Sequence, residues 1–336
     1  MNFAMNFNVI GVGEVLWDLL LTGPQLGGAP ANFAYHAHAL GAQTQVITRV
    51  GKDDYGREII RRFHEMGLPE TGVQVDETAP TGTAKVALSG DGLAHFTIQE
   101  NVAWDQIAVT RKALAAAREA DAICFGSLAQ RSEPSRHTIQ QLVAAAPAAA
   151  LRVFDINLRQ QFYSHDVIEE SLHLANVLKL NDDELPTLAA MFGLTGSAED
   201  HSCGADTPVR VFAARQPSAR TGVSAPHKIE HQIECLAQTF SLRLVALTRG
   251  ANGSLLYQKD NDNNDARWSD CPSRPVKVVD TVGAGDSFTA AMVLGLLRKM
   301  DLDEINTIAN EVARYVCSQP GATPALPIEL ARRFSI

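Results

Sequence analysis

The sequence predicts an α/β protein in which helices cover both faces of a mostly parallel sheet. Short apolar or β-branched runs alternate with helix-like stretches along most of the 336 residues, which is the pattern of such a sheet. Apolar residues make up 46% and charged residues 20% of the chain, as in ordinary soluble globular proteins. Two alternating runs around a glycine turn at residues 82–99 interrupt this pattern and predict a β-hairpin.

The first elements are predicted to be a strand, a loop, a helix and a second strand. Residues 7–11 are a short apolar run ending in glycine, and residues 31–40 are alanine-rich and stop before Gly41. Residues 44–50 are again β-branched. Later strands are expected at residues 122–126, 151–155 and 177–180, separated by helices such as residues 135–145 and 167–175.

Two stretches lack apolar periodicity. Residues 196–228 contain three prolines with several serines and threonines, and residues 260–265 are entirely polar. Both are expected to be surface loops, because such compositions have little apolar surface to bury. The hairpin at residues 82–99, inserted in an α/β body, is a candidate lid.

Charge and apolar pattern exclude several classes of function. The chain has 29 basic and 38 acidic residues and a net charge of −9, so the basic surface that nucleic-acid binding requires is not expected. No apolar run approaches the ~20 residues of a membrane-spanning helix, and the N-terminus has no secretory pattern. The five cysteines are scattered and never form C-x-x-C, which favours reduced thiols in a cytoplasmic protein.

Residues 276–297 are the most informative segment. Residues 276–279 have the pattern of a buried strand, residues 281–286 contain a glycine-rich turn, and a helix is expected from residue 287. The first N–H groups of a helix have no internal partner, so Gly283, Ala284 and Gly285 can present donors to phosphate oxygens. Asp286 beside such a cradle is either a general base for an attacking hydroxyl or an acid that caps the helix, and both interpretations remain open here.

A second group of polar residues lies near the start of the chain. Glu14 and Asp18 flank the end of the first strand, and Gly28 and Asn32 lead into the first helix. An acceptor and an amide at the carboxyl end of a strand suit a ligand rich in hydroxyl groups, such as a sugar. The alternative is an exposed aspartate and an asparagine that caps the helix.

A third group follows the later strands. Asp155, Asn157 and Arg159 follow one strand, Asn181 and Glu184 follow the next, and residues 248–253 follow another. All are expected at the same edge of the sheet. At that edge an arginine can hold a hydroxyl or anionic group, a glutamate can act on Mg²⁺ through water, and the glycines can pass beneath a nucleotide.

Two of these segments resemble the motifs of the pfkB family of carbohydrate kinases, which have the ribokinase-like fold, and specifically its fructokinases. Residues 27–56 (GGAPANFAYHAHALGAQTQVITRVGKDDYG) resemble the N-terminal motif, and residues 280–293 (DTVGAGDSFTAAMV) resemble the C-terminal motif. The resemblance runs from about residue 9 to 325 and implies a single domain. It implies a small β lid from about residues 14–35 and 82–104, with residues 196–228 as an irregular insertion.

The resemblance also implies roles for individual residues. Asp286 would be the general base on the sugar hydroxyl, and Gly283, Ala284 and Gly285 would form the anion hole. The sugar site would contain Asp18, Gly28, Asn32, Arg159 and, from the lid, Phe96. The side that binds ATP and Mg²⁺ would contain Lys179, Asn181, Glu184, Thr248, Gly250, Gly253 and Asn310. Asp280 would lie at a monovalent-cation site, for K⁺ in some relatives.

The sequence is therefore interpreted as an ATP-dependent kinase that transfers the γ-phosphoryl group to a primary hydroxyl, with fructose as the expected acceptor. A 2-keto-3-deoxygluconate or nucleoside kinase is the alternative within the family, and a non-catalytic sugar or nucleotide sensor is the alternative of another class. A dehydrogenase is disfavoured because Leu16 occupies the third glycine position of G-x-G-x-x-G. The exposed strands of the lid predict a homodimer.

Overall fold

The largest part of the molecule is a nine-stranded sheet. The computed structural model describes residues 7–20, 23–88, 94–194, 225–259 and 266–334. Within these ranges the sheet contains β1 (Asn8–Val12), β4 (Gln43–Gly51), β5 (Val73–Asp76), β8 (Ala122–Phe125), β9 (Leu151–Asp155), β10 (Val177–Asn181), β11 (Leu244–Thr248), β12 (Ser254–Lys259) and β13 (Ala266–Cys271). The order is β13-β12-β11-β10-β9-β8-β1-β4-β5; the pairs β11–β12 and β12–β13 are antiparallel, and the other pairs are parallel. The predicted mostly parallel sheet is confirmed.

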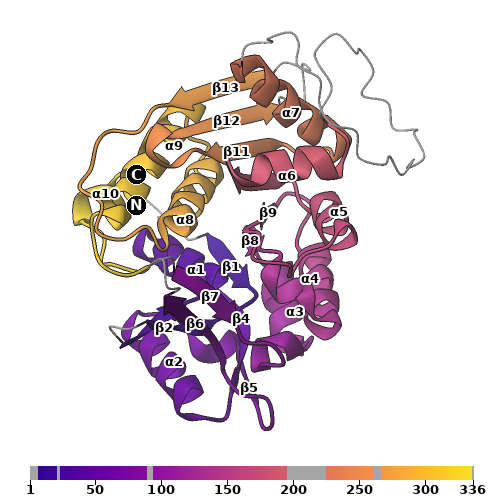
Figure 1. Ribbon diagram of the computed structural model, residues 1–336, viewed down its shortest axis with the longest axis vertical. Coiled ribbons are helices and arrows are strands. Elements are labelled where there is room, and N and C mark those ends of the chain that lie inside the picture. Colours follow the sequence, from indigo (N-terminus) through magenta and orange to yellow (C-terminus); the bar gives the residue numbers. More distant parts are fainter. Residues whose placement is uncertain (1–6, 21–22, 89–93, 195–224, 260–265, 335–336) are drawn as a thin grey trace, which may run out of the picture.

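Helices cover both faces of this sheet. Those of the described residues are α1 (Ala29–Ala39), α2 (Asp54–Glu65), α3 (Arg111–Arg118), α4 (Glu133–Ala145), α5 (His165–Leu174), α6 (Glu184–Met191), α7 (Ala225–Thr239), α8 (Ala284–Leu297), α9 (Leu302–Cys317) and α10 (Ile328–Arg332). The side chains of successive strand residues belong to hydrophobic cores on opposite faces of the sheet. Val177 belongs to the core that contains residues of α1, α8 and α9, whereas Leu178 belongs to the core that contains residues of α3 to α7. Figure 1 shows these two groups of helices on opposite sides of the strands. The alternation follows from the two-residue period of a strand.

A second, smaller sheet stands beside the first helix. It contains β2 (Leu16–Leu20), β3 (Gly23–Gly27), β6 (Gly82–Leu88) and β7 (Ala94–Ile98), in the order β3-β2-β6-β7. The antiparallel pairing of β6 with β7 confirms the predicted hairpin, although its turn, residues 89–93, lies outside the described residues. The two ranges expected to build a lid therefore meet in one sheet, and β3 leads directly into α1.

The expected strand at residues 276–279 is wrong. The structure has no strand there, and the side chains of Val278 and Val279 are 56% and 57% exposed. The N–H groups of Val279 and Asp280 bond the carbonyl oxygen of Cys317 at the end of α9, so no neighbouring strand satisfies them. The apolar pattern reflects only the local preference of this segment. A strand also requires a neighbouring strand whose backbone groups form hydrogen bonds with it.

The two stretches expected to be irregular lie mostly outside the described residues. This applies to residues 196–224 and 260–265. The end of the first stretch is helical, since α7 begins at Ala225, so its expected boundary at residue 228 is wrong. The four cysteines that the structure describes are free thiols, and Cys203 lies outside the described residues.

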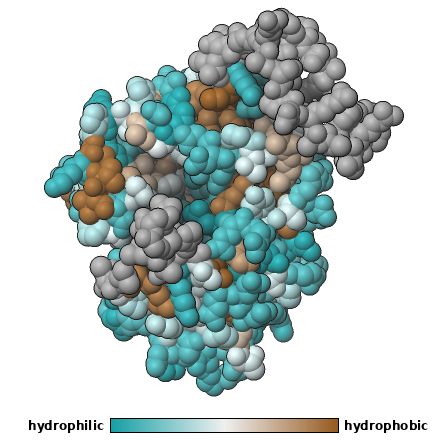
Figure 2. All heavy atoms as spheres, viewed as in Figure 1, coloured by the Kyte–Doolittle hydropathy of each residue, from teal (hydrophilic) through white to brown (hydrophobic). Residues whose placement is uncertain are grey.

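The surface of the described residues is mostly polar. The face in Figure 2 is largely hydrophilic, with scattered hydrophobic side chains. In the part of the chain that the structure describes, no helix combines the length and apolar character needed to cross a membrane.

Candidate active site

The glycine-rich turn ends at the first residue of α8. Gly283 is the N-cap residue, with a φ angle of 78°, which is the left-handed region that favours glycine. A Cβ atom at this position would lie 2.3 Å from the carbonyl oxygen of Ala322, so a larger residue has no space. The first N–H groups of α8 have no intrahelical acceptor, and the helix dipole adds partial positive charge there. The turn therefore has the geometry of an anion site.

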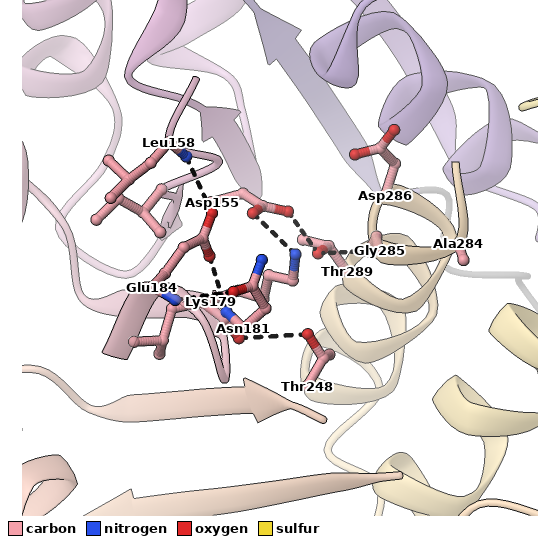
Figure 3. Close-up of polar contacts among 12 residues, drawn as sticks. Asp155, Leu158, Lys179, Asn181, Glu184, Thr248, Ala284, Gly285, Asp286 and Thr289 are labelled. Carbon is pink, nitrogen blue, oxygen red and sulfur yellow. Dashed lines mark hydrogen bonds and ion pairs between the residues drawn. The ribbon is translucent and has the colours of Figure 1, made fainter. Parts of the chain in front are cut away.

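Asp286 lies in the first turn of α8 but does not cap the helix. No side chain caps α8, and the carboxylate accepts a hydrogen bond from Nδ2 of Asn32 at 2.8 Å instead. Asn32 is 4% exposed and lies in the first turn of α1. Figure 3 shows the carboxylate of Asp286 pointing away from the helix toward the N-terminal part of the chain. The two motifs, 254 residues apart, meet at this hydrogen bond.

Burial controls the ionisation of Asp286. Burial and, to a smaller extent, the negative charge of Asp155 raise the pKa of this carboxyl to about 6. The hydrogen bond from Asn32 and the positive charges of Lys179 and Arg159 oppose this effect. Asp286 is therefore ionised at neutral pH, with a pKa close enough to 7 to accept a proton from a hydroxyl group.

We expect kcat/KM to fall as the pH is lowered through about 6, because Asp286 must be ionised to accept a proton. In the Asn32→Ala variant this acid limb should move to higher pH, since the lost hydrogen bond favours the ionised form. Initial rates between pH 4.5 and 9, in buffers of constant ionic strength, measure the acid limb of the wild type and that of the Asn32→Ala variant. A rate independent of pH down to pH 5 would contradict a basic role for Asp286.

Lys179, which the family resemblance assigns to the nucleotide side, lies beside Gly285 of the glycine-rich turn. It lies in β10 with 8% of its side chain exposed, and its Nζ is 3.1 Å from Oδ1 of Asp155 in β9. The hydroxyl of Thr289 in α8 lies 2.9 Å from Oδ2 of Asp155 and 2.9 Å from the carbonyl oxygen of Gly285. A Cβ atom at Gly285 would lie 3.0 Å from Nζ of Lys179. Figure 3 shows how this chain of contacts ties α8 to the sheet.

The carboxylate of Glu184 is also held by the main chain. It accepts hydrogen bonds from the N–H groups of Leu158 at 2.9 Å and Asn181 at 2.8 Å. Burial raises the pKa of Glu184, while the charge of Lys179 and these two N–H groups lower it. Each carboxylate oxygen keeps a second lone pair, which can accept a hydrogen bond from a metal-bound water.

Direct coordination of a metal by several protein groups is not supported. Among the residues that the structure describes, no group of three or more histidines, cysteines, aspartates and glutamates is placed to hold a metal ion. Mg²⁺ often keeps several waters and binds through one or two carboxylates and the phosphates of the substrate. The arrangement of Glu184 fits that mode of binding.

The remaining residues assigned to the nucleotide side lie around β11 and β12. Thr248 ends β11, and Gly250 begins a 3₁₀ turn (Gly250–Asn252) that leads into β12. Gly253 has a φ angle of 86°, and a Cβ atom there would lie 2.0 Å from the carbonyl oxygen of Cys271. Asn310 in α9 donates to Oγ of Ser254 at 2.6 Å. These four residues therefore come from the carboxyl end of β11 and from the elements packed beside it.

The residues assigned to the sugar side come from the small sheet, α1 and the loop after β9. Asp18 lies in β2, and its pKa is raised to about 6 by burial against the opposing effect of Arg159. The φ angle of Gly28 is 116°, and a Cβ atom there would lie 2.5 Å from the carbonyl oxygen of Glu14. Arg159 lies within electrostatic range of both Asp18 and Asp286, and its positive charge lowers the pKa of each carboxyl. Phe96 pairs with Val86 in the backbone of β7, and its side chain lies outside the described residues.

The carboxylate of Asp280 holds two loops together. Its oxygens accept hydrogen bonds from the N–H groups of Val282 and Gly321, each at 3.0 Å. The side chain thus links the glycine-rich turn to the loop after α9. A monovalent cation at this position would depend mainly on backbone oxygens, so its assignment to Asp280 stays a prediction.

Two polar residues of this region received no role from the sequence. Thr289 and His36 are both 0% exposed, and both make side-chain hydrogen bonds near the start of α8. Such positions can be recognised in a sequence as polar residues on the buried face of a helix. The method fails for α1 and α8, because both helices are apolar over most of their surface and the sequence does not show which face is buried.

Comparisons with known proteins agree with this geometry. The model of the pfkB family carbohydrate kinase matches residues 23–329. Sugar kinase PH1459 of Pyrococcus horikoshii is 26% identical, covering 94% of this chain and 91% of that protein. A fructokinase of Solanum tuberosum is 26% identical over 96% of this chain and 93% of its own.

Solved structures show the same fold. The crystal structure of PH1459 matches with a TM-score of 0.72 over 97% of this chain and 99% of that chain. A fructokinase of Xylella fastidiosa matches with a TM-score of 0.73 at 22% identity over 97% of each chain. Because the family model covers residues 23–329, which is most of the sequence, the chain belongs to the pfkB family of carbohydrate kinases.

Proposed function

We propose that this protein is a fructokinase that transfers the γ-phosphoryl group of ATP to a primary hydroxyl of fructose. The observation that carries the proposal is the position of Asp286: its carboxylate is partly buried, oriented by Asn32 at 2.8 Å, and adjacent to the first N–H groups of α8. A base beside an anion site serves a hydroxyl that attacks a phosphate. A sensor without catalysis has no use for that combination.

The proposed mechanism uses the site residues in three ways. Asp286 accepts the proton of the attacking hydroxyl, and the N–H groups at Gly283, Ala284 and Gly285 stabilise the charge on the transferring phosphoryl group. Asn32 keeps the carboxylate aimed at the hydroxyl, which contributes through positioning. Bound Mg²⁺ would neutralise part of the negative charge on the phosphates of ATP. Glu184 would hold the ion through water, and Asp18 and Arg159 would hold the sugar.

The ligands bound to related proteins support these substrates. PH1459 has been crystallised with ATP, and a ribokinase II of E. coli with ATP and Mg²⁺. A fructokinase of Vibrio cholerae has been crystallised with fructose, ADP and calcium. K⁺ is proposed only as an activator at the loop held by Asp280.

A coupled assay with ATP and Mg²⁺ tests the proposal. Fructose, other ketohexoses, ribose, nucleosides and 2-keto-3-deoxygluconate are compared by kcat/KM, each with and without K⁺. The proposal expects the highest value for fructose. A higher value for 2-keto-3-deoxygluconate or a nucleoside would replace fructose within the same chemistry. Absence of turnover with every acceptor, together with sugar binding, would favour a sensor.

We expect a homodimer formed through the small sheet. Among the described strands, β3 and β7 are the edges of that sheet, and exposed edges pair readily with a second copy. Light scattering coupled to size-exclusion chromatography should give about twice the chain mass of 36.2 kDa. A single-chain mass at every loading concentration would contradict a dimer.

A further inference from the structure

A buried histidine of α1 contacts the loop after α9. His36 is 0% exposed, and its Nε2 lies 2.9 Å from the carbonyl oxygen of Ala322, which is 286 residues away in the chain. Burial lowers the pKa of His36 to about 4, so the ring is neutral at pH 7. A carbonyl oxygen can only accept, so Nε2 carries the hydrogen and donates it.

The same carbonyl group lies against the catalytic turn. The position of a Cβ atom at Gly283 falls 2.3 Å from the oxygen of Ala322 and 2.8 Å from its Cα atom. The adjacent residue, Gly321, donates its N–H to Asp280 at the other end of the turn. The loop is therefore enclosed by α1 on one side and by the catalytic turn on the other.

The first helix thus holds the site at two points. Asn32 and His36 are four residues apart, so they lie on one face of α1, and that helix packs against α8. Asn32 orients Asp286, the proposed base, while His36 fixes the loop on which the N-cap residue of α8 rests. Contacts with α1 therefore position both the proposed base, Asp286, and the N–H groups of the Gly283 turn.

We propose that His36 is a positioning residue for phosphoryl transfer, which holds the Gly283 turn in place through Ala322. The inference rests on the proposed function, because only a reacting phosphoryl group requires the donors of this turn to stay aligned with Asp286. The alternative is a histidine that only fills the core. A core residue affects the stability and the folded fraction of the enzyme, whereas misalignment of an anion hole lowers the kcat of the folded enzyme and leaves KM almost unchanged.

Two amide variants separate these roles. In His36→Gln the amide nitrogen lies at the reach of Nε2 and can still donate to Ala322. In His36→Asn the amide is one methylene too short to reach it. His38→Asn is the matched control, because His38 lies on the same helix but only partly buried and has no contact with the catalytic turn.

We expect kcat with fructose and ATP to fall about 10- to 100-fold in His36→Asn, while KM for both substrates stays within about twofold. His36→Gln and His38→Asn should keep kcat within about twofold of the wild type. Equal kcat values in the Asn and Gln variants would overturn the inference, as would parallel changes in kcat and KM. Circular dichroism verifies that each variant is folded at the assay temperature.

Crystal structures keep the inference testable if no acceptor is found. Failure of the wild type with every acceptor would refute the proposed function alone. In that case the structures of the two His36 variants are compared with the wild type. Displacement of Ala322 and of the Gly283 turn in the Asn variant, with restoration in the Gln variant, supports the positioning role. An unmoved turn in both variants overturns it.

Discussion

Replacing Asp286 with alanine should lower kcat by about 10² to 10⁴-fold, which is the usual effect of losing a general base. The carboxylate is the only group that the described contacts place both in the first turn of α8 and against Asn32. Nucleotide affinity should be retained, because the N–H groups at the start of α8 do not depend on this side chain. Steady-state kinetics and calorimetric titration with an ATP analogue measure the two quantities separately.

The matched control is Asp303→Ala. Asp303 also lies in the first turn of a helix, α9, but is exposed and outside the site. This variant should keep kcat within about twofold, which shows that loss of an acid at a helix start is not itself damaging. An Asp286→Ala enzyme within twofold of the wild type would remove this residue from the role of base.

Replacing Lys179 with methionine should lower the free energy of unfolding by about 3 to 5 kcal/mol, the usual cost of leaving a buried charge without its partner. The pair with Asp155 is buried on both sides, with 8% and 7% of the side chains exposed. Methionine has a similar length, so the loss is mainly that of charge. Equilibrium unfolding in urea, monitored by fluorescence and circular dichroism, measures the change.

The double variant Lys179→Met/Asp155→Asn separates charge from packing. In the double variant the carboxylate of Asp155, which lacks a positive partner in Lys179→Met, is replaced by a neutral amide. The double variant should therefore recover part of the stability that the single variant loses. Arg49→Met serves as the control, because its ion pair with Asp76 is more exposed, with 24% of the arginine side chain accessible. A single variant no less stable than the double variant would show that the Lys179 charge is not needed to compensate Asp155.

The success of the strand predictions depended on where each strand lies. Residues 151–155 and 177–180 are mostly buried, so short segments that are mainly apolar are a sufficient signal. Residues 276–279 have a similar composition but run along the surface and bond the end of α9. Composition reports the preference of a segment, and only a neighbouring edge makes it a strand.

In the candidate site, too, local features can be predicted from the sequence, whereas contacts between distant segments cannot. The glycine turn and Asp286 were identified from sequence because the order strand-like segment, turn and helix is local and its chemistry follows from helix ends. The choice between base and cap was left open, because it depends on Asn32, which is distant in the chain. The ion pair of Lys179 with Asp155 and its position beside Gly285 have no local signal in the sequence, because they depend on the register of β10 against β9 and α8.

The fold class, the family resemblance and the candidate anion site can be predicted from the amino-acid sequence, because periodicity, glycine turns and helix starts are encoded within short segments. The tertiary structure alone decided how Asp286 is oriented, what Lys179 compensates and what His36 holds. Each of these depends on contacts between residues far apart in the chain, and the free energy of a buried polar group is fixed by its partners.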